Sequence, residues 1–276
     1  MRILIFIIFF GLTRVFAHPS VSIIMDSKGN VYYSDLRQVW KINTQGKKEV
    51  IVRNVHTHEL FFDKDDNLYG EHLWYENETN TWKHYVWRLT VDNKLEKIIP
   101  DTKGFQKDFS FVQDRNGNMY LPDDLEDCQK IIKKQSNGVQ TKLGDKCLTK
   151  IKWMTCTPDG VVYVIDNNDL KKIDKQGHIS LVVDKLSEKK QDGSTSYLSG
   201  PNVDANGNVY ISDYDAQQVK KISVDKTITV FAKTNLPWSP TGSLVAPNGD
   251  FWILECSPTN EVRVERITKD GRRIIY

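Results

Sequence analysis

Histidine, glutamate and tryptophan gather in one short stretch of this sequence, where they could bind a ligand, hold a metal ion or exchange protons. His56 and His58 are two residues apart, so they lie on one face of an extended segment, and Glu71, His72 and Trp74 follow one turn later. We predict that His56, His58 and His72 converge. Three imidazoles and a water would satisfy zinc and lower the pKa of that water, and without a metal His58 and His72 could act as acid and base. The plainer alternative is that these histidines are polar partners of neighbouring loops.

Three further polar residues could complete a binding pocket. Lys152 could meet an anionic ligand, and Ser199 and Thr241 offer hydroxyl groups. The sequence contains no Gly-x-Ser-x-Gly elbow, phosphate-binding loop or Cys-x-x-Cys pair, so nothing in it supports nucleophilic hydrolysis or nucleotide use. The 38 basic and 36 acidic residues are interspersed and leave a net charge of +2, which argues against nucleic acid as a partner.

A repeat that occurs six times must position these residues. In each copy an apolar strand ends in a polar turn, and a second apolar strand follows at once. The turn needs a positive φ angle, which glycine adopts readily and aspartate tolerates. Two more β-like segments follow each copy, and four strands in about 40 residues are typical of a propeller blade. The turn positions are Gly29, Asp66, Gly117, Gly160, Gly207 and Gly249.

The sequence therefore predicts an all-β, six-bladed β-propeller with four antiparallel strands in each blade. Its first and last repeats are both complete, so we expect the ring to close by packing of whole blades. The expected blades cover residues 20–54, 55–104, 105–147, 148–190, 191–236 and 237–276, behind a signal peptide at 1–17.

The repeat pattern, Asp-x-x-Gly-Asn followed by an aromatic-rich strand, resembles NHL repeats and the related gluconolactonase (senescence marker protein) family of six-bladed propellers. The resemblance covers essentially the whole mature chain, and its best copy spans residues 199–213. It implies metal ligands, a Glu, an Asn and an Asp, eight residues before the turn position in separate blades. Here that ring reads Val21, His58, Phe109, Lys152, Ser199 and Thr241. Calcium prefers several oxygen ligands, so the missing carboxylates disfavour calcium, and a divalent transition metal is the alternative.

A second ring of residues, six positions after each turn, should reach the same mouth of the central channel. Five of its six members are acidic, and we expect each carboxylate to cap the backbone of its own loop. Blade two alone carries a histidine there. The ring reads Asp35, His72, Asp123, Asp166, Asp213 and Glu255.

The first seventeen residues are typical of a secretory signal, with Arg2 before an apolar run that is too short to span a bilayer. We expect a secreted or periplasmic protein with no stable membrane insertion after cleavage. Cys128 and Cys147 flank the outer part of one repeat and are the candidate disulfide. Asn77 begins a glycosylation sequon, which is meaningful in a eukaryotic source.

Two hypotheses for the function follow from these residues. The first is a non-catalytic propeller that binds a small molecule, a glycan or a protein at the mouth around blade two. The second is a hydrolase or lyase, similar to a lactonase, that acts on a small carbohydrate-derived substrate with the histidines of blade two.

Overall fold

The computed structural model describes residues 19–104, 112–123 and 128–276. The predicted signal peptide and Phe109 lie outside these residues. Within them, no helix is long and apolar enough to cross a membrane.

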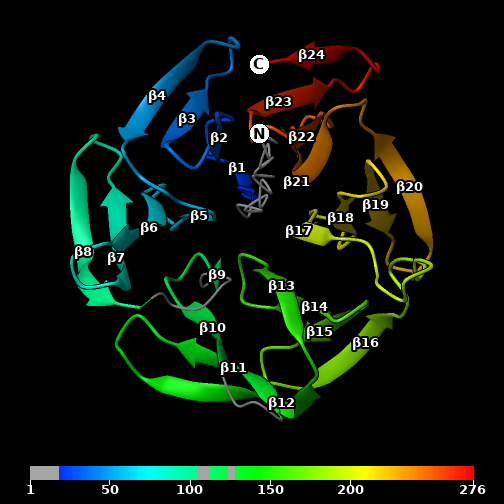
Figure 1. The fold of residues 1–276 in the computed structure, drawn as a ribbon, viewed down its shortest axis with the longest axis horizontal. Coiled ribbons are helices and arrows are strands. Elements are labelled where there is room, and N and C mark those ends of the chain that lie inside the picture. The colour runs from blue at the N-terminus through cyan, green and yellow to red at the C-terminus, as the bar shows by residue number, and fades with distance from the viewer. Residues whose placement is uncertain (1–18, 105–111, 124–127) are drawn as a thin grey trace, which may run out of the picture.

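The described strands form six four-stranded antiparallel sheets arranged as the blades of a propeller, as predicted (Figure 1). The first strand of each blade lies beside the central axis and the fourth lies at the rim (Figure 1). Blade one consists of β1 (Ile23–Met25), β2 (Val31–Ser34), β3 (Gln38–Ile42) and β4 (Lys48–Arg53). Blade two consists of β5 (Leu60–Phe62), β6 (Leu68–Glu76), β7 (Thr81–Leu89) and β8 (Leu95–Lys103). Blade three consists of β9 (Val112–Gln113), β10 (Met119–Asp123), β11 (Gln129–Lys134) and β12 (Gln140–Leu148).

The second half of the ring repeats this order. Blade four consists of β13 (Ile151–Cys156), β14 (Val162–Asp166), β15 (Asp169–Ile173) and β16 (Ile179–Val183). Blade five consists of β17 (Leu198–Val203), β18 (Val209–Asp213), β19 (Gln218–Ile222) and β20 (Ile228–Lys233). Blade six consists of β21 (Ser239–Val245), β22 (Phe251–Cys256), β23 (Val262–Ile267) and β24 (Arg273–Ile275). Blades one and six are each built from one continuous stretch of chain, so the ring closes by packing of whole blades.

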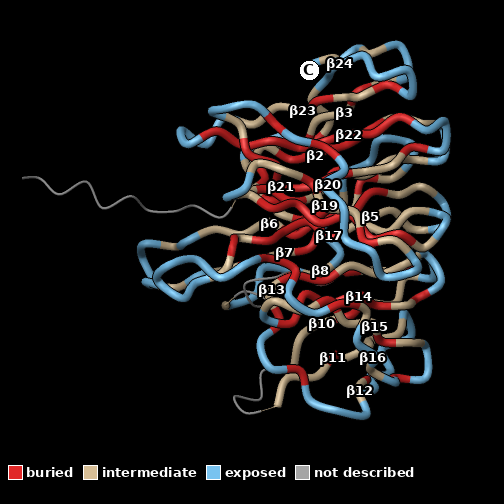
Figure 2. The backbone as a smooth tube through the Cα atoms, turned by 90° about the vertical axis from the view of Figure 1, so that its right-hand side faces the viewer, coloured by how far each residue is buried: buried red, intermediate tan, exposed pale blue. Residues whose placement is uncertain are grey.

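The core consists of apolar clusters between neighbouring blades, which appear as the buried centre of the molecule (Figure 2). Tyr33 of blade one packs in one cluster with Trp252 and Leu254 of blade six, and this contact joins the two ends of the ring. Blade two differs from the others in the length of its central hairpin. Strands β6 and β7 have nine residues each, and their hairpin extends from one face of the ring (Figure 2).

The inner turns have the backbone conformation that the repeat predicts. All six turn positions have positive φ, from 77° to 91° at the five glycines and 59° at Asp66. In blades one, two, three and five, an aspartate at the start of the turn organises it. In blade five, Asp204 Oδ1 accepts the backbone N–H groups of Asn206 and Asn208, and Oδ2 accepts the Asn208 amide and the Tyr210 hydroxyl.

Replacing Asp204 with alanine leaves these donors without their acceptor. We expect the free energy of unfolding to fall by about 2 kcal/mol, since each partly buried donor left unpaired is costly. Asp225→Ala is the matched control, because Asp225 caps an exposed turn of the same blade. Chemical denaturation measures both losses, and equal losses would contradict the assigned role of Asp204.

The disulfide expected from the sequence is present. Cys128, just before β11, is bonded to Cys147 in β12, with 4.8 Å between their Cα atoms. It joins the two outer strands of blade three. Cys156 and Cys256 are free thiols.

Candidate functional site

Two of the three predicted histidines are in direct contact at the start of blade two. The Nε2 atoms of His56 and His58 are 3.1 Å apart, and the two rings meet edge to face. A contact between two ring nitrogens requires one N–H donor and one lone-pair acceptor. One N–H therefore lies between the two rings of the neutral pair, and protonation of the accepting Nε2 would break the hydrogen bond and place one positive charge beside the other ring.

His72 joins this group through its ring nitrogen and through aromatic packing. Its Nδ1 accepts the backbone N–H of His56 at 2.8 Å, so in the neutral ring the proton is on Nε2. The ring stacks on Trp74 with 5.3 Å between centroids and also packs against Tyr85. His72 thus has a fixed tautomer and orientation.

Burial favours the neutral form of these imidazoles. Desolvation lowers the pKa of His56, and burial, followed by the neighbouring His56, lowers the pKa of His72. All three rings are half-buried and keep part of their surface accessible. The cluster can therefore accept protons or hydrogen bonds near neutral pH.

The lowered pKa values predict a loss of stability on acidification. A histidine whose pKa is lower in the folded state binds fewer protons than in the unfolded chain, so folding becomes less favourable as pH falls below about 6.5. We expect the unfolding free energy of the native protein to fall more between about pH 7.5 and 5.5 than that of His56→Gln. Parallel slopes for native and His56→Gln proteins would refute the assignment.

The other predicted binding residues are placed differently. Ser199 and Thr241 are fully buried, and their hydroxyls donate to the backbone carbonyls of Thr241 and Leu254. They hold inner strands together and do not face the channel. Lys152 is half-buried, and its Nζ is 3.2 Å from the Thr195 hydroxyl. Burial, followed by the nearby Lys150, lowers the pKa of Lys152.

The capping interpretation is confirmed for three carboxylates of the acidic ring, and the other two form ion pairs within their own blades. Asp35, Asp166 and Asp213 each accept backbone N–H groups of adjacent loops. Asp123 pairs with Lys142 at 2.7 Å, and Glu255 pairs with Arg263 at 2.6 Å. Each of these carboxylates thus has a partner within its own blade, whereas His72 contacts the His56 backbone, Trp74 and Tyr85.

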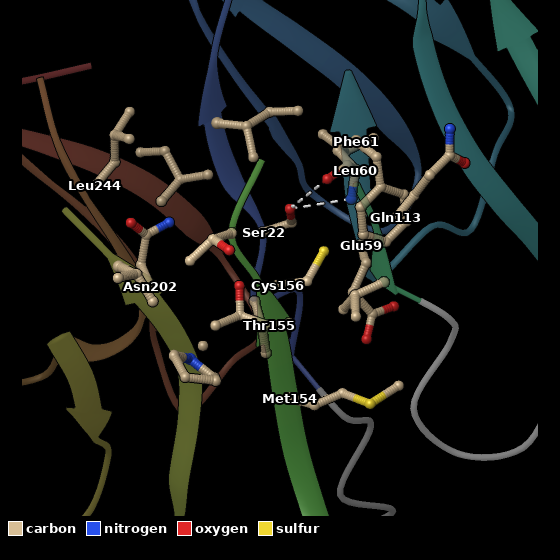
Figure 3. Close-up of a pocket in the computed structure, with 18 of the residues that line it drawn as sticks. Ser22, Glu59, Leu60, Phe61, Gln113, Met154, Thr155, Cys156, Asn202 and Leu244 are labelled. Atoms are coloured by element: carbon tan, nitrogen blue, oxygen red, sulfur yellow. Dashed lines mark hydrogen bonds between the residues drawn. The ribbon is translucent and has the colours of Figure 1, made fainter. Parts of the chain in front are cut away.

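The central channel contains a cavity of about 270 Å³ between the inner strands (Figure 3). Its polar lining includes Ser22, Glu59, Gln113 and Asn202, and its apolar lining includes Met154. Figure 3 shows the Ser22 hydroxyl bonded to the Leu60 backbone, which fixes the start of β5 beside Glu59.

Sequence reasoning missed Glu59, although the repeat carried a signal. The position seven residues before each turn reads Ser22, Glu59, Ser110, Trp153, Gly200 and Gly242. A Cβ atom on Gly200 would lie 2.3 Å from the Thr241 carbonyl oxygen, and one on Gly242 would lie 2.0 Å from that of Val21. The inner strands of blades five, six and one therefore pack backbone to backbone here, whereas blade two has room for a carboxyl group.

The predicted histidine metal site has little support in this geometry. Among the residues that the structure describes, no group of three or more His, Cys, Asp or Glu side chains is arranged to hold a metal ion. His72 uses Nδ1 for the His56 backbone, and His56 and His58 use Nε2 for each other. The arrangement instead supplies hydrogen-bonding and proton-accepting groups beside a cavity.

Comparison with known proteins identifies solved structures with a similar fold. No protein-family model and no curated protein matches the chain. A streptogramin B lyase structure is 13% identical with a TM-score of 0.56, over 93% of this chain and 82% of that one. An auxiliary nutrient binding protein from Bacteroides ovatus is 12% identical with a TM-score of 0.64, over 93% and 69%. The calcium-binding protein regucalcin from Agrobacterium tumefaciens is 13% identical with a TM-score of 0.55, over 86% and 82%. The predicted resemblance to six-bladed propellers of this type is thus confirmed at the level of the fold.

Proposed function

We propose that this protein is a ligand-binding propeller that holds a small, uncharged, oxygen-rich molecule at the mouth of its channel beside blade two. The observation that carries the proposal is the contact between His56 and His58, with Nε2 atoms 3.1 Å apart, directly before Glu59 of the cavity lining. Neutral imidazoles donate to and accept from hydroxyl and carbonyl groups. The His72–Trp74–Tyr85 group adds aromatic faces, on which the C–H groups of a sugar ring can stack.

The second candidate function is a lyase or hydrolase that acts at the same place. It is favoured by a base and an acid that are close together in the chain. The lowered pKa of His56 keeps its ring neutral and able to accept a proton, whereas the raised pKa of Glu59 favours its protonated form. Similar folds are described as a lyase and as a nutrient binding protein, so the propeller itself suits either function.

An extracytoplasmic location is part of the proposal. A disulfide between Cys128 and Cys147 is typical of proteins that fold in an oxidising compartment. Nutrient or substrate capture outside the cytoplasm would fit this location.

The proposal predicts that His58 is required for binding. A panel of monosaccharides, sugar acids and lactones would be titrated by calorimetry into the native protein and into His58→Ala. We expect a panel member to bind the native protein and His58→Ala to weaken its binding at least about tenfold, which is the loss of one good hydrogen bond to a buried ligand.

His178→Ala is the matched control, because it removes an exposed histidine from another blade. Thermal denaturation of each variant establishes that it is folded. Equal affinities of the native protein and folded His58→Ala would contradict the proposed site. Chemical conversion of a panel member that is lost in His58→Ala would favour the enzyme.

A further inference from the structure

Glu59 is a buried carboxyl group at the wall of the channel cavity. It lies in the connection just before β5 and is 9% exposed. Its side chain lines the cavity between the inner strands, as do those of Met154 and Cys156 (Figure 3). The lining of the cavity thus includes one acid that is almost fully buried.

Other buried groups lie close to Glu59 among the described residues. From β6, the buried Glu71 is close enough for its charge to act on Glu59, and Glu71 in turn lies 4.0 Å from Nε2 of the buried His84 of β7. The uncharged thiol of Cys156 lines the cavity from β13, and the hydroxyl of Tyr197 approaches from the segment before β17. His58 and Lys152, on the neighbouring segments, are half-buried at the mouth.

Two physical effects act in the same direction on this carboxyl group. Burial is the larger, and the charge of Glu71 adds to it, so the pKa of Glu59 is raised well above its usual range. The acid form, with its O–H group, is therefore favoured in the folded protein.

We propose that Glu59, in its neutral acid form, donates a hydrogen bond to a carbonyl, ring or lactone oxygen of the ligand inside the channel. This inference rests on the proposed function and names the ligand class more closely. A carboxylate at this position would attract cations, whereas a carboxylic acid selects an uncharged acceptor oxygen. A cavity of about 270 Å³ suits a molecule of the size of a monosaccharide.

Glu71 is a positioning residue in this account, because it acts on the ligand only through Glu59. His84 Nδ1 is 2.7 Å from the Gly104 carbonyl oxygen, which can only accept, so Nδ1 carries a proton and Nε2 faces Glu71. Glu71 is itself buried in β6, where its backbone carbonyl accepts the Thr57 hydroxyl at 2.8 Å. Removing its charge should lower the pKa of Glu59 and leave the shape of the cavity unchanged.

The first test needs no ligand. Infrared difference spectra between the native protein and Glu59→Gln at pH 7 should show the carbonyl stretch of one protonated carboxylic acid, present only in the native protein. Glu49→Gln, at an exposed position of β4, should retain that band. In Glu71→Gln the band should disappear at a lower pH than in the native protein. A native spectrum without the band would overturn the inference.

The second test uses the lactone and monosaccharide panel. Glu59→Gln keeps a neutral N–H donor and should bind within about threefold of the native protein, whereas Glu59→Ala should lose at least about tenfold. Native affinity should fall as pH rises through the pKa of Glu59, and that of Glu59→Gln should not.

The outcomes separate the two proposals. Binding that depends on His58 but is equal in native and Glu59→Ala proteins would overturn the role of Glu59 and leave the proposed function standing. Binding to no member of the panel would contradict the proposed function, and with it the ligand contact of Glu59.

Discussion

Replacing Trp87 with alanine is expected to lower the free energy of unfolding by about 3–5 kcal/mol, the cost of emptying a large buried site. Trp87 is 1% exposed in β7, and its indole N–H donates to the Thr57 hydroxyl at 3.2 Å. Thr57 lies between the two contacting histidines and donates to the Glu71 carbonyl at 2.8 Å. Loss of the indole therefore removes core packing and also the hydrogen bond that supports Thr57 between His56 and His58.

Trp82→Ala is the matched control for this prediction. It removes the same side chain from the same strand at a position that is 44% exposed, so its cost should stay below about 1 kcal/mol. Trp87→Phe keeps most of the ring volume and should cost less than Trp87→Ala, while still losing the bond to Thr57. Chemical denaturation ranks the three variants. A similar cost for Trp87→Ala and Trp82→Ala would show that Trp87 does not support blade two.

Gly242→Ala is expected to destabilise the protein by about 3 kcal/mol, because the added methyl group cannot be accommodated without backbone movement. Its Cβ would lie 2.0 Å from the Val21 carbonyl oxygen, at the contact between the last and first blades. The two closest atoms belong to the Val21 backbone, so no flexible side chain can move aside to relieve the clash. The substitution should therefore weaken closure of the ring.

Gly271→Ala separates this steric effect from backbone strain. Gly271 has a φ of 86° and open space where a Cβ would be, so alanine there should cost about 1 kcal/mol from conformation alone. The midpoint and slope of denaturant unfolding distinguish the two variants. A Gly242→Ala protein as stable as Gly271→Ala would mean that the first and last blades do not pack as closely as described.

The fold could be predicted from the sequence because the repeat encodes local geometry. Each turn requires a positive φ, and even the exception, Asp66, adopts one at 59°. The spacing of Cys128 and Cys147 across the outer strands of one repeat was also sufficient to predict their disulfide. These features depend on residues close together in the chain.

The site could be predicted only in part. The repeat shows where a residue lies along its strand, but it does not show whether the neighbouring blade buries that residue. Ser199 and Thr241 occupy the expected positions at the inner strands, but close backbone packing between blades five and six buries both hydroxyls. Glu59 was missed because this repeat position varies from glycine to tryptophan, so the glutamate alone does not reveal the cavity. The contact between His56 and His58, by contrast, follows from their spacing of two residues on one extended segment.

The most direct measurement of ligand binding beside blade two is the nuclear magnetic resonance spectrum of the histidine side chains. The protein has six histidines, so selectively labelled imidazole signals can be assigned by single substitutions. Addition of a panel member that binds should shift the Nε2 signals of His56 and His58 and leave the exposed His178 unchanged. A ligand that binds the native protein without moving either of those two signals would contradict the proposed site.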